Sequence, residues 1–272
     1  MNRFRYRALV ILAALAAPSL FAQDALATIK AAEYALGMIR GPQRIDAINT
    51  MEVWATGTGA VRTATALPIT YHASYSYRTP AQRIDITRDS KGIALGLIPN
   101  GRTIEVMNGQ YAWDESVPGG GFIPGSRAMP SAGLAERQLQ MWTTPHGVLK
   151  AAERAAKDAK VSKDGAATVV TFPLLPLPGI TVKMMLNAKS EVEKVEATGT
   201  SPALGSVNAE ATYSGYKDLG EIATDVMFPA HIVRKRNGTV VLDLTVTKVD
   251  ANNPYVVFPV PDVVEKAPKV AR

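Results

Sequence analysis

The chain has no cysteine among its 272 residues, and it has only three histidines. The missing cysteines exclude disulfide bonds, thiolate metal sites, iron–sulfur clusters and a cysteine nucleophile. The histidines His72, His146 and His231 are too far apart in the sequence for an H-x-H or H-E-x-x-H zinc motif. A histidine metal site could therefore form only if the fold brought these residues together.

Sequence motifs for other catalytic chemistries are also missing. No G-x-S-x-G elbow is found, and the glycine run Gly119–Gly121 lacks the helix and the lysine of a phosphate-binding loop. The acidic residues form no D-x-D-x-D-G calcium loop, and a carboxylate pair such as Asp85 with Asp114 could be assembled only by the fold. We predict no catalytic, cofactor or metal residues, and a hydrolase that uses scattered carboxylates is the least favoured alternative.

Residues 1–22 have the layout of a secretory signal peptide. Three arginines form a positively charged segment, an apolar run follows at Ala8–Ala17, and Ala22 is a small residue at the cleavage position. The run is too short to cross a bilayer, and no later stretch reaches the ~20 apolar residues of a membrane helix. We expect cleavage near Ala22, a periplasmic or extracellular location, and no membrane span afterwards. An uncleaved anchor is the alternative.

The chain carries little excess charge of one sign. Lysine and arginine number 30 and aspartate and glutamate 24, and the formal net charge of +6 falls by three when the signal peptide is removed. The remaining excess is spread along the chain, without the basic patch that binds a phosphate backbone. Nucleic acid is therefore excluded as a partner.

The hydropathy pattern predicts one helix and then a long series of strands. Apolar residues recur on one face of a helix over Asp24–Leu36, which Gly37 is expected to end. From about Ile45 the apolar period is two, as in Ile69–Tyr77. Turn pairs that favour tight antiparallel hairpins then recur at Lys91-Gly92, Asn100-Gly101, Asn108-Gly109, Asp164-Gly165 and Asn237-Gly238. This pattern predicts an antiparallel meander.

A helical insertion interrupts the strands. After a loop rich in glycine and proline (Val117–Gly133), helices are expected over Leu134–Trp142 and Pro145–Ala159, the second capped by Thr144. Further strands are expected at Ala167–Phe172, Ile180–Leu186, Glu191–Ala197, Val207–Tyr216, Phe228–Arg236 and Val240–Val249. We predict an α+β fold, mostly antiparallel β, with a single domain at residues 23–262 and a frayed tail or linker at 263–272.

Large and adaptable side chains could line an apolar cavity in such a sheet, because aromatic and thioether groups suit irregular apolar ligands. The candidate lining residues are Trp54, Tyr71, Tyr75, Trp113, Met141, Trp142 and Met184. A filled core made of the same residues is the alternative, since the sequence does not separate a packed half-barrel from a hollow one.

The order of the expected elements resembles that of periplasmic lipoprotein carriers of the LolA type. An export signal, a helix, antiparallel strands, a helical insertion and more strands follow one another in this order. The resemblance implies a LolA-like curled half-barrel sheet with an N-terminal helix and a central helical insertion that covers its concave side. It also implies an apolar small molecule or a lipid as the partner.

Particular segments resemble the N-terminal accessory module of secreted metallo-β-lactamase-fold hydrolases. These segments are Gly109–Trp113, Met141–Ala152, Tyr213–Asp218, Phe228–His231, Leu242–Thr247 and Phe258–Asp262. In that family, hydrolysis belongs to a downstream zinc domain with an H-x-H-x-D-H motif, which this sequence does not contain. The resemblance therefore implies an accessory module without its enzyme, and a downstream hydrolase domain is a candidate partner.

The sequence is compatible with two functions. We predict a non-catalytic, exported binding or accessory module that holds an apolar or lipid ligand in its half-barrel and uses no cofactor. The alternative is the N-terminal fragment of a secreted metallo-β-lactamase-fold hydrolase. In that case we expect the reading frame to continue past Arg272 into an H-x-H-x-D-H segment.

Overall fold

The computed structural model describes residues 24–40, 45–60, 65–89 and 101–267. The strands of its main sheet are β3 (Thr50–Gly59), β4 (Leu67–Ser76), β5 (Ala81–Arg88), β6 (Arg102–Asn108), β7 (Tyr111–Glu115), β8 (Ala128–Pro130), β9 (Lys160–Asp164), β10 (Ala167–Pro173), β11 (Ile180–Leu186), β12 (Val192–Ser201), β13 (Gly205–Asp218), β14 (Met227–Arg236) and β15 (Thr239–Ala251). A separate pair is formed by β1 (Ile39–Arg40) and β2 (Ile45–Asp46). The expected signal peptide, residues 1–22, lies outside the described residues.

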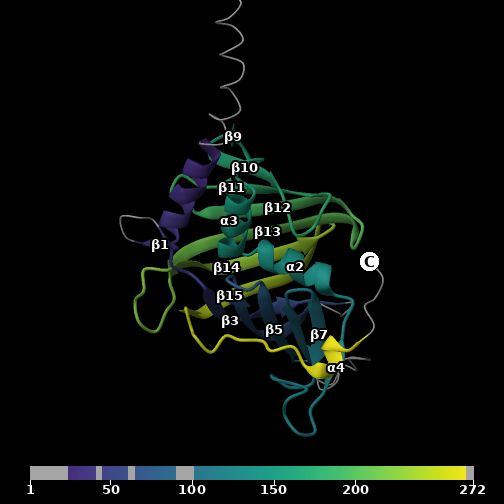
Figure 1. Ribbon diagram of the computed structural model, residues 1–272. Coiled ribbons are helices and arrows are strands. Elements are labelled where there is room, and N and C mark those ends of the chain that lie inside the picture. Colours follow the sequence, from purple (N-terminus) through teal and green to yellow (C-terminus); the bar gives the residue numbers. More distant parts are fainter. Residues whose placement is uncertain (1–23, 41–44, 61–64, 90–100, 268–272) are drawn as a thin grey trace, which may run out of the picture.

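The main sheet is an open, curled meander of 13 antiparallel strands (Figure 1). Its order is β8-β7-β6-β5-β4-β3-β15-β14-β13-β12-β11-β10-β9. Most neighbours in the sheet are also neighbours in the chain, and the exception is β3, which pairs with β15 along its length. This pairing joins the first and last long strands at the centre of the sheet. The predicted mostly antiparallel α+β fold is confirmed.

Three of the predicted hairpin turns lie within the described residues. Asn108-Gly109 joins β6 to β7, Asp164-Gly165 joins β9 to β10, and Asn237-Gly238 joins β14 to β15. Asn237 and Gly238 have φ angles of 48° and 79°, and two positive values in succession are what a type I′ turn requires. Lys91-Gly92 and Asn100 lie outside the described residues.

The helices cover the concave face of the sheet (Figure 1). They are the N-terminal helix (residues 24–35), α2 (Leu134–Trp142) and α3 (Pro145–Arg154). The short α4 (Asp262–Glu265), near the C-terminus, packs on the opposite face against β7 and β8. The Thr144 hydroxyl accepts a hydrogen bond of 3.1 Å from the Gly147 amide, as expected for the cap of α3. None of the helices in the described part of the chain is long and apolar enough to cross a membrane.

The segment after α3 differs from the sequence-based expectation. The helix ends at Arg154 and not at Ala159, and Lys160–Asp164 form the edge strand β9. Almost every residue of β9 is exposed, so this strand carries no alternation of apolar and polar residues. Its position is set by pairing with β10, which is a tertiary contact that the hydropathy pattern does not contain.

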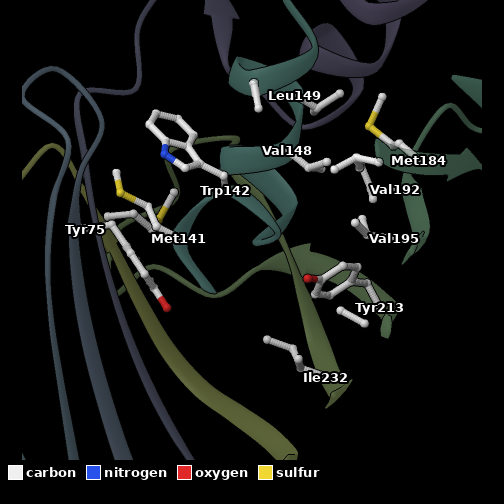
Figure 2. Packing of buried hydrophobic residues seen from close by; sticks show 14 of the residues in the cluster. Tyr75, Met141, Trp142, Val148, Leu149, Met184, Val192, Val195, Tyr213 and Ile232 are labelled. Atoms are coloured by element: carbon white, nitrogen blue, oxygen red, sulfur yellow. The ribbon is translucent and has the colours of Figure 1, made fainter. Parts of the chain in front are cut away.

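Two apolar clusters lie on opposite faces of the sheet. The main core fills the space between the helices and the concave face (Figure 2). The smaller cluster joins Val106 and Trp113 to Phe258 and Val264 on the other face. Residues 262–265, where the tail was expected to begin, thus form α4 and bury Val264 against β7 and β8.

Candidate ligand-binding pocket

A pocket of about 370 Å³ lies between α2 and the concave face of the strands from β12 to β15. Val195, Ala209, Ala211 and Leu242 contribute to its floor, and Leu139 of α2 contributes to its roof. The alanines leave room beneath the helix because their side chains are short. The result is a space with an apolar floor and a single helix as its roof, whose wall also includes charged side chains such as Glu105, Arg234 and Lys235.

Arg137 fixes α2 to the far side of the curled sheet. Its side chain is 2% exposed, and its Nη1 donates hydrogen bonds to the carbonyl oxygens of Val106 (2.7 Å) and Trp113 (2.8 Å). Its Nη2 pairs with the carboxylate of Asp114 on β7, and Glu105 Oε2 lies 4.0 Å from its Nε. A buried guanidinium with this many acceptors anchors this side of the helix to β6 and β7.

Two further arginines, both on β14, fix α2 to the near side of the pocket. Arg234 Nη2 donates hydrogen bonds to the Gln140 carbonyl oxygen (2.8 Å) and to Thr143 Oγ1 (2.7 Å). Arg236 forms an ion pair with Glu136. The roof is therefore attached to the strands beneath it by polar contacts, with apolar surface left between them.

Buried phenols surround Arg234. The Tyr213 hydroxyl donates to the Thr143 carbonyl oxygen, and the hydroxyls of Tyr71 and Tyr75 lie 3.1 Å apart. Burial raises the pKa of Tyr213 to about 12, and it raises the pKa of Tyr71 and Tyr75 as well. These phenols are therefore neutral at physiological pH.

Five of the seven side chains predicted to line a cavity lie in the main core. Figure 2 shows Tyr75 near Met141 and Trp142 at one end of the cluster, and Met184 near Val192 at the other. Tyr71 belongs to the same cluster. These five fill the space beneath α2 and α3 and do not form the walls of the 370 Å³ pocket.

The other two predicted side chains lie on the convex face. Trp113 is fully buried in the smaller cluster, where its Nε1 donates to Glu115 Oε1 at 2.9 Å. Trp54 stacks on His72, with ring centroids 4.6 Å apart. Neither tryptophan is part of the pocket wall.

The residues that the sequence-based prediction missed are the arginines Arg137, Arg234 and Arg236. Arg234 and Arg236 have the period of two of a strand, and they follow Ile232 on the helix-facing side of β14. Charged residues on the inner face of a strand are unusual, and this could have marked them as candidates. Arg137 gives no such signal, because helix surfaces commonly carry arginine.

The histidines are separated in the folded chain. His72 pairs with Glu52 and His231 with Asp243, both on strands, while His146 stacks on Phe228 with ring centroids 5.5 Å apart. Burial lowers the pKa of His146 to about 3, so that its ring is neutral. The described residues contain no group of three or more His, Cys, Asp or Glu side chains that could hold a metal ion.

The carboxylates considered from the sequence each face an arginine. Asp85 accepts a hydrogen bond of 2.9 Å from Arg102 Nε, and Asp114 pairs with Arg137. Each of these arginines joins its carboxylate to a neighbouring element of the fold. The contacts of both residues therefore match a structural role.

A second pocket, of about 280 Å³, lies at the other end of the helical layer beside α3. Its wall includes Asp46 and Lys150, which form an ion pair, and Glu153, which pairs with Lys30. Arg154 lies over the Trp142 ring, 4.5 Å from its centroid. The wall is mostly polar, in contrast to the apolar floor of the first pocket.

No family model matches the chain, and no curated protein does. Among solved structures, it is similar to a LolA superfamily protein from Nitrosomonas europaea, with 14% identity, a TM-score of 0.47, and coverage of 86% of this chain and 94% of that one. It is also similar to an outer membrane lipoprotein-sorting protein domain from Vibrio parahaemolyticus (9%, 0.45, 83% and 92%). A DUF1329 family protein from Desulfovibrio piger is comparable (7%, 0.44, 84% and 92%).

Proposed function

We propose that this chain is a non-catalytic, exported binding protein that holds an apolar or lipid ligand in the pocket under α2. The observation that carries this proposal is the 370 Å³ space with apolar side chains on its floor and roof. Ligand pockets measure roughly 300–1,000 Å³ and combine apolar walls with a few polar groups that orient the ligand. Removal of apolar ligand surface from water would supply the driving force.

The polar attachment of α2 supports a role in ligand entry. Arg234 and Arg236 line the pocket, and each contacts the helix through a single side chain. Contacts of this kind can be exchanged for water at modest net cost, because a hydrogen bond of a charged group is worth about 1.5–3 kcal/mol. A ligand could thus enter where Arg234 and Arg236 release the near side of α2, while Arg137 keeps the helix attached to β6 and β7.

Export is the second part of the proposal. It rests on the charged and apolar segments within residues 1–22, which are typical of a signal peptide. Mass spectrometry of the protein recovered from cell fractions should find an N-terminus near Gln23 in the periplasmic or extracellular fraction. A full-length chain that stays in the membrane fraction would support the uncleaved anchor instead.

The binding test uses a neutral fluorescent probe, N-phenyl-1-naphthylamine, with the purified full chain. We expect saturable fluorescence enhancement that is lost in Ala209→Phe, because the ring would occupy the floor of the pocket. The matched control is Asn208→Phe, which places the same ring at the neighbouring, exposed position of β13.

Two results would contradict the binding proposal. One is the absence of saturable probe binding to the wild-type protein. The other is equal binding by Ala209→Phe and by the control, with circular dichroism showing that both are folded. Either result would leave the pocket as a packing imperfection.

The alternative proposal is an accessory module of a secreted metallo-β-lactamase-fold hydrolase. The segments that favour it include Met141–Ala152, which spans the end of α2 and most of α3, and Phe258–Asp262, which leads into α4. Sequencing of the source locus past codon 272 tests it. An in-frame H-x-H-x-D-H segment would establish the alternative, and a stop codon would remove it.

A further inference from the structure

The pocket contains one positive charge that no carboxylate neutralises. Within the described residues, Arg234 forms no ion pair. Its Nη2 donates to the Gln140 carbonyl oxygen and to Thr143 Oγ1, and its side chain also hydrogen-bonds to the phenol of Tyr213, so all of these partners are neutral. The other cations of the pocket wall have acidic partners: Arg137 with Asp114, Lys235 with Glu210, and Arg236 with Glu136. Arg234 thus differs from its neighbours on the same strand.

The phenols near Arg234 do not compensate its charge. Burial lowers the pKa of Arg234, but the neighbouring phenols of Tyr213, Tyr75 and Tyr71 outweigh this effect, and the pKa is raised overall. The guanidinium is therefore charged at physiological pH, and the phenols beside it are neutral. A charge that is removed from water without a counter-ion is costly, and an anionic ligand would relieve this cost.

We propose that the natural ligand is a single-chain amphiphile with an anionic headgroup, a carboxylate or a phosphate, bound by Arg234. A guanidinium has five N–H donors in a planar fork that matches such oxygens, and the two bonds of Nη2 leave donors for the ligand. The alkyl chain would lie against Leu139, Ala211 and Leu242. The inference rests on the proposed function and specifies its ligand class.

The size of the pocket supports one chain and not several. Its volume of about 370 Å³ is near the lower limit of the range of roughly 300–1,000 Å³ for ligand pockets. The wall also combines apolar residues such as Leu139 and Leu242 with the guanidinium of Arg234, a polar group for which a neutral hydrocarbon has no partner. Both features favour a small amphiphile.

The experiment compares headgroups on one chain length. The assay measures displacement of N-phenyl-1-naphthylamine from the full chain by four ligands, each below its micelle concentration. They are dodecanoate, dodecyl phosphate, dodecanol and dodecyltrimethylammonium. We expect at least one of the two anions to bind at least tenfold more tightly than dodecanol, and the cation to bind least tightly. Inorganic phosphate alone should displace no probe, and the tighter of the two anions identifies the headgroup.

The variants separate the charge of Arg234 from its contacts with α2. Arg234→Met and Arg234→Gln should reduce the preference for the anion to less than twofold while dodecanol binds as in the wild type. Arg234→Gln retains an amide donor toward Thr143 and Gln140, so it keeps the test valid if Arg234→Met does not fold. Lys183→Met is the control, because it removes one positive charge at an exposed position of β11.

Several outcomes would overturn this inference without touching the proposed function. They are equal binding of both anions and dodecanol by the wild type, an anion preference that survives in Arg234→Gln, and displacement by inorganic phosphate alone. Equal loss of dodecanol and anion binding in Arg234→Gln would also overturn it, since it would assign Arg234 to the attachment of α2. If the neutral probe itself does not bind, the proposed function fails first.

Discussion

The two central helices lie side by side on the same sheet, but different forces hold them. All the side chains of α3 from Pro145 to Ala152 are buried, and the Thr144 hydroxyl caps its first turn. In α2 the cap residue is Gly133, without a side-chain hydrogen bond, and half of the helix faces a pocket. Polar contacts of Arg137, on α2 itself, and of Arg234 and Arg236, on β14, replace the missing apolar contacts of α2.

This difference indicates which helix can move. Apolar burial over a whole helix is lost only when the core opens, and it contributes several kcal/mol. Polar contacts at a pocket rim can be replaced by water or by a ligand. We therefore interpret α3 as the fixed part of the helical layer and α2 as the adjustable part.

The largest expected effect is on the α3 side. Leu149 is fully buried in the main core, and Leu149→Ala should lower the free energy of unfolding by about 3 kcal/mol because it leaves a cavity. Urea denaturation measures this change. Leu175→Ala is the matched control, since Leu175 is 53% exposed and its truncation should have little effect. A loss below about 1 kcal/mol for Leu149→Ala would contradict a fixed α3.

A smaller effect on the free energy of unfolding is expected from Glu33, a buried carboxyl group near α3. Glu33 on the N-terminal helix is 1% exposed, and burial raises its pKa to about 7, although Lys30 contacts it at 2.7 Å. The folded state thus binds more protons than the unfolded state between pH 4.5 and 7, so stability falls as the pH rises through this interval.

The measurement is the free energy of unfolding at pH 5 and at pH 8. The wild type should lose on the order of 2 kcal/mol more than Glu33→Gln, since one pKa unit corresponds to about 1.4 kcal/mol. The variant has no carboxylate at this position to titrate. Identical pH profiles for the two proteins would show that Glu33 titrates normally.

The cap of α3 should contribute less. Thr144 Oγ1 accepts from the Gly147 amide at 3.1 Å and lies 3.2 Å from the Tyr77 hydroxyl. Thr144→Ala should lower the free energy of unfolding by about 1 kcal/mol, the usual value for loss of a helix cap. Thr144→Ser keeps the hydroxyl and should lose less than half as much. Thermal or urea unfolding can resolve the two variants, and equal losses would point to the methyl group.

The smallest effect on stability is expected at α2. Glu136→Gln weakens the ion pair with Arg236, and partly exposed pairs are worth about 1 kcal/mol or less. Hydrogen exchange should nevertheless speed up at the α2 amides and stay unchanged at the α3 amides. Faster exchange in both helices, or in neither, would show that they open as one unit.

The sequence predicted the local structure well where the local pattern is strong. The bounds of α2 and β11 agree with the observed ones, Leu134–Trp142 and Ile180–Leu186. The Asn237-Gly238 turn is present because both residues tolerate positive φ angles. The edge strand β9 was missed, since its exposed residues follow no apolar pattern.

The candidate site was much less predictable. Large apolar side chains were expected to line a cavity, but five of them pack together in the core, as side chains of high apolar area tend to do. The pocket is found instead where short side chains, Ala209 and Ala211, face a helix. Small residues in a strand give no signal of empty space until their neighbours are placed.

The sequence by itself thus determined the series of strands, the turns between them and the caps, because these depend on residues close together in the chain. Only the tertiary structure decided where the pocket forms and which charged side chains line it. Arg234 and Gln140 are 94 positions apart, and their contact exists because β14 passes beneath α2 in the curled sheet. Such pairings between distant residues decide whether an arginine has a carboxylate as its partner. No local sequence pattern encodes them.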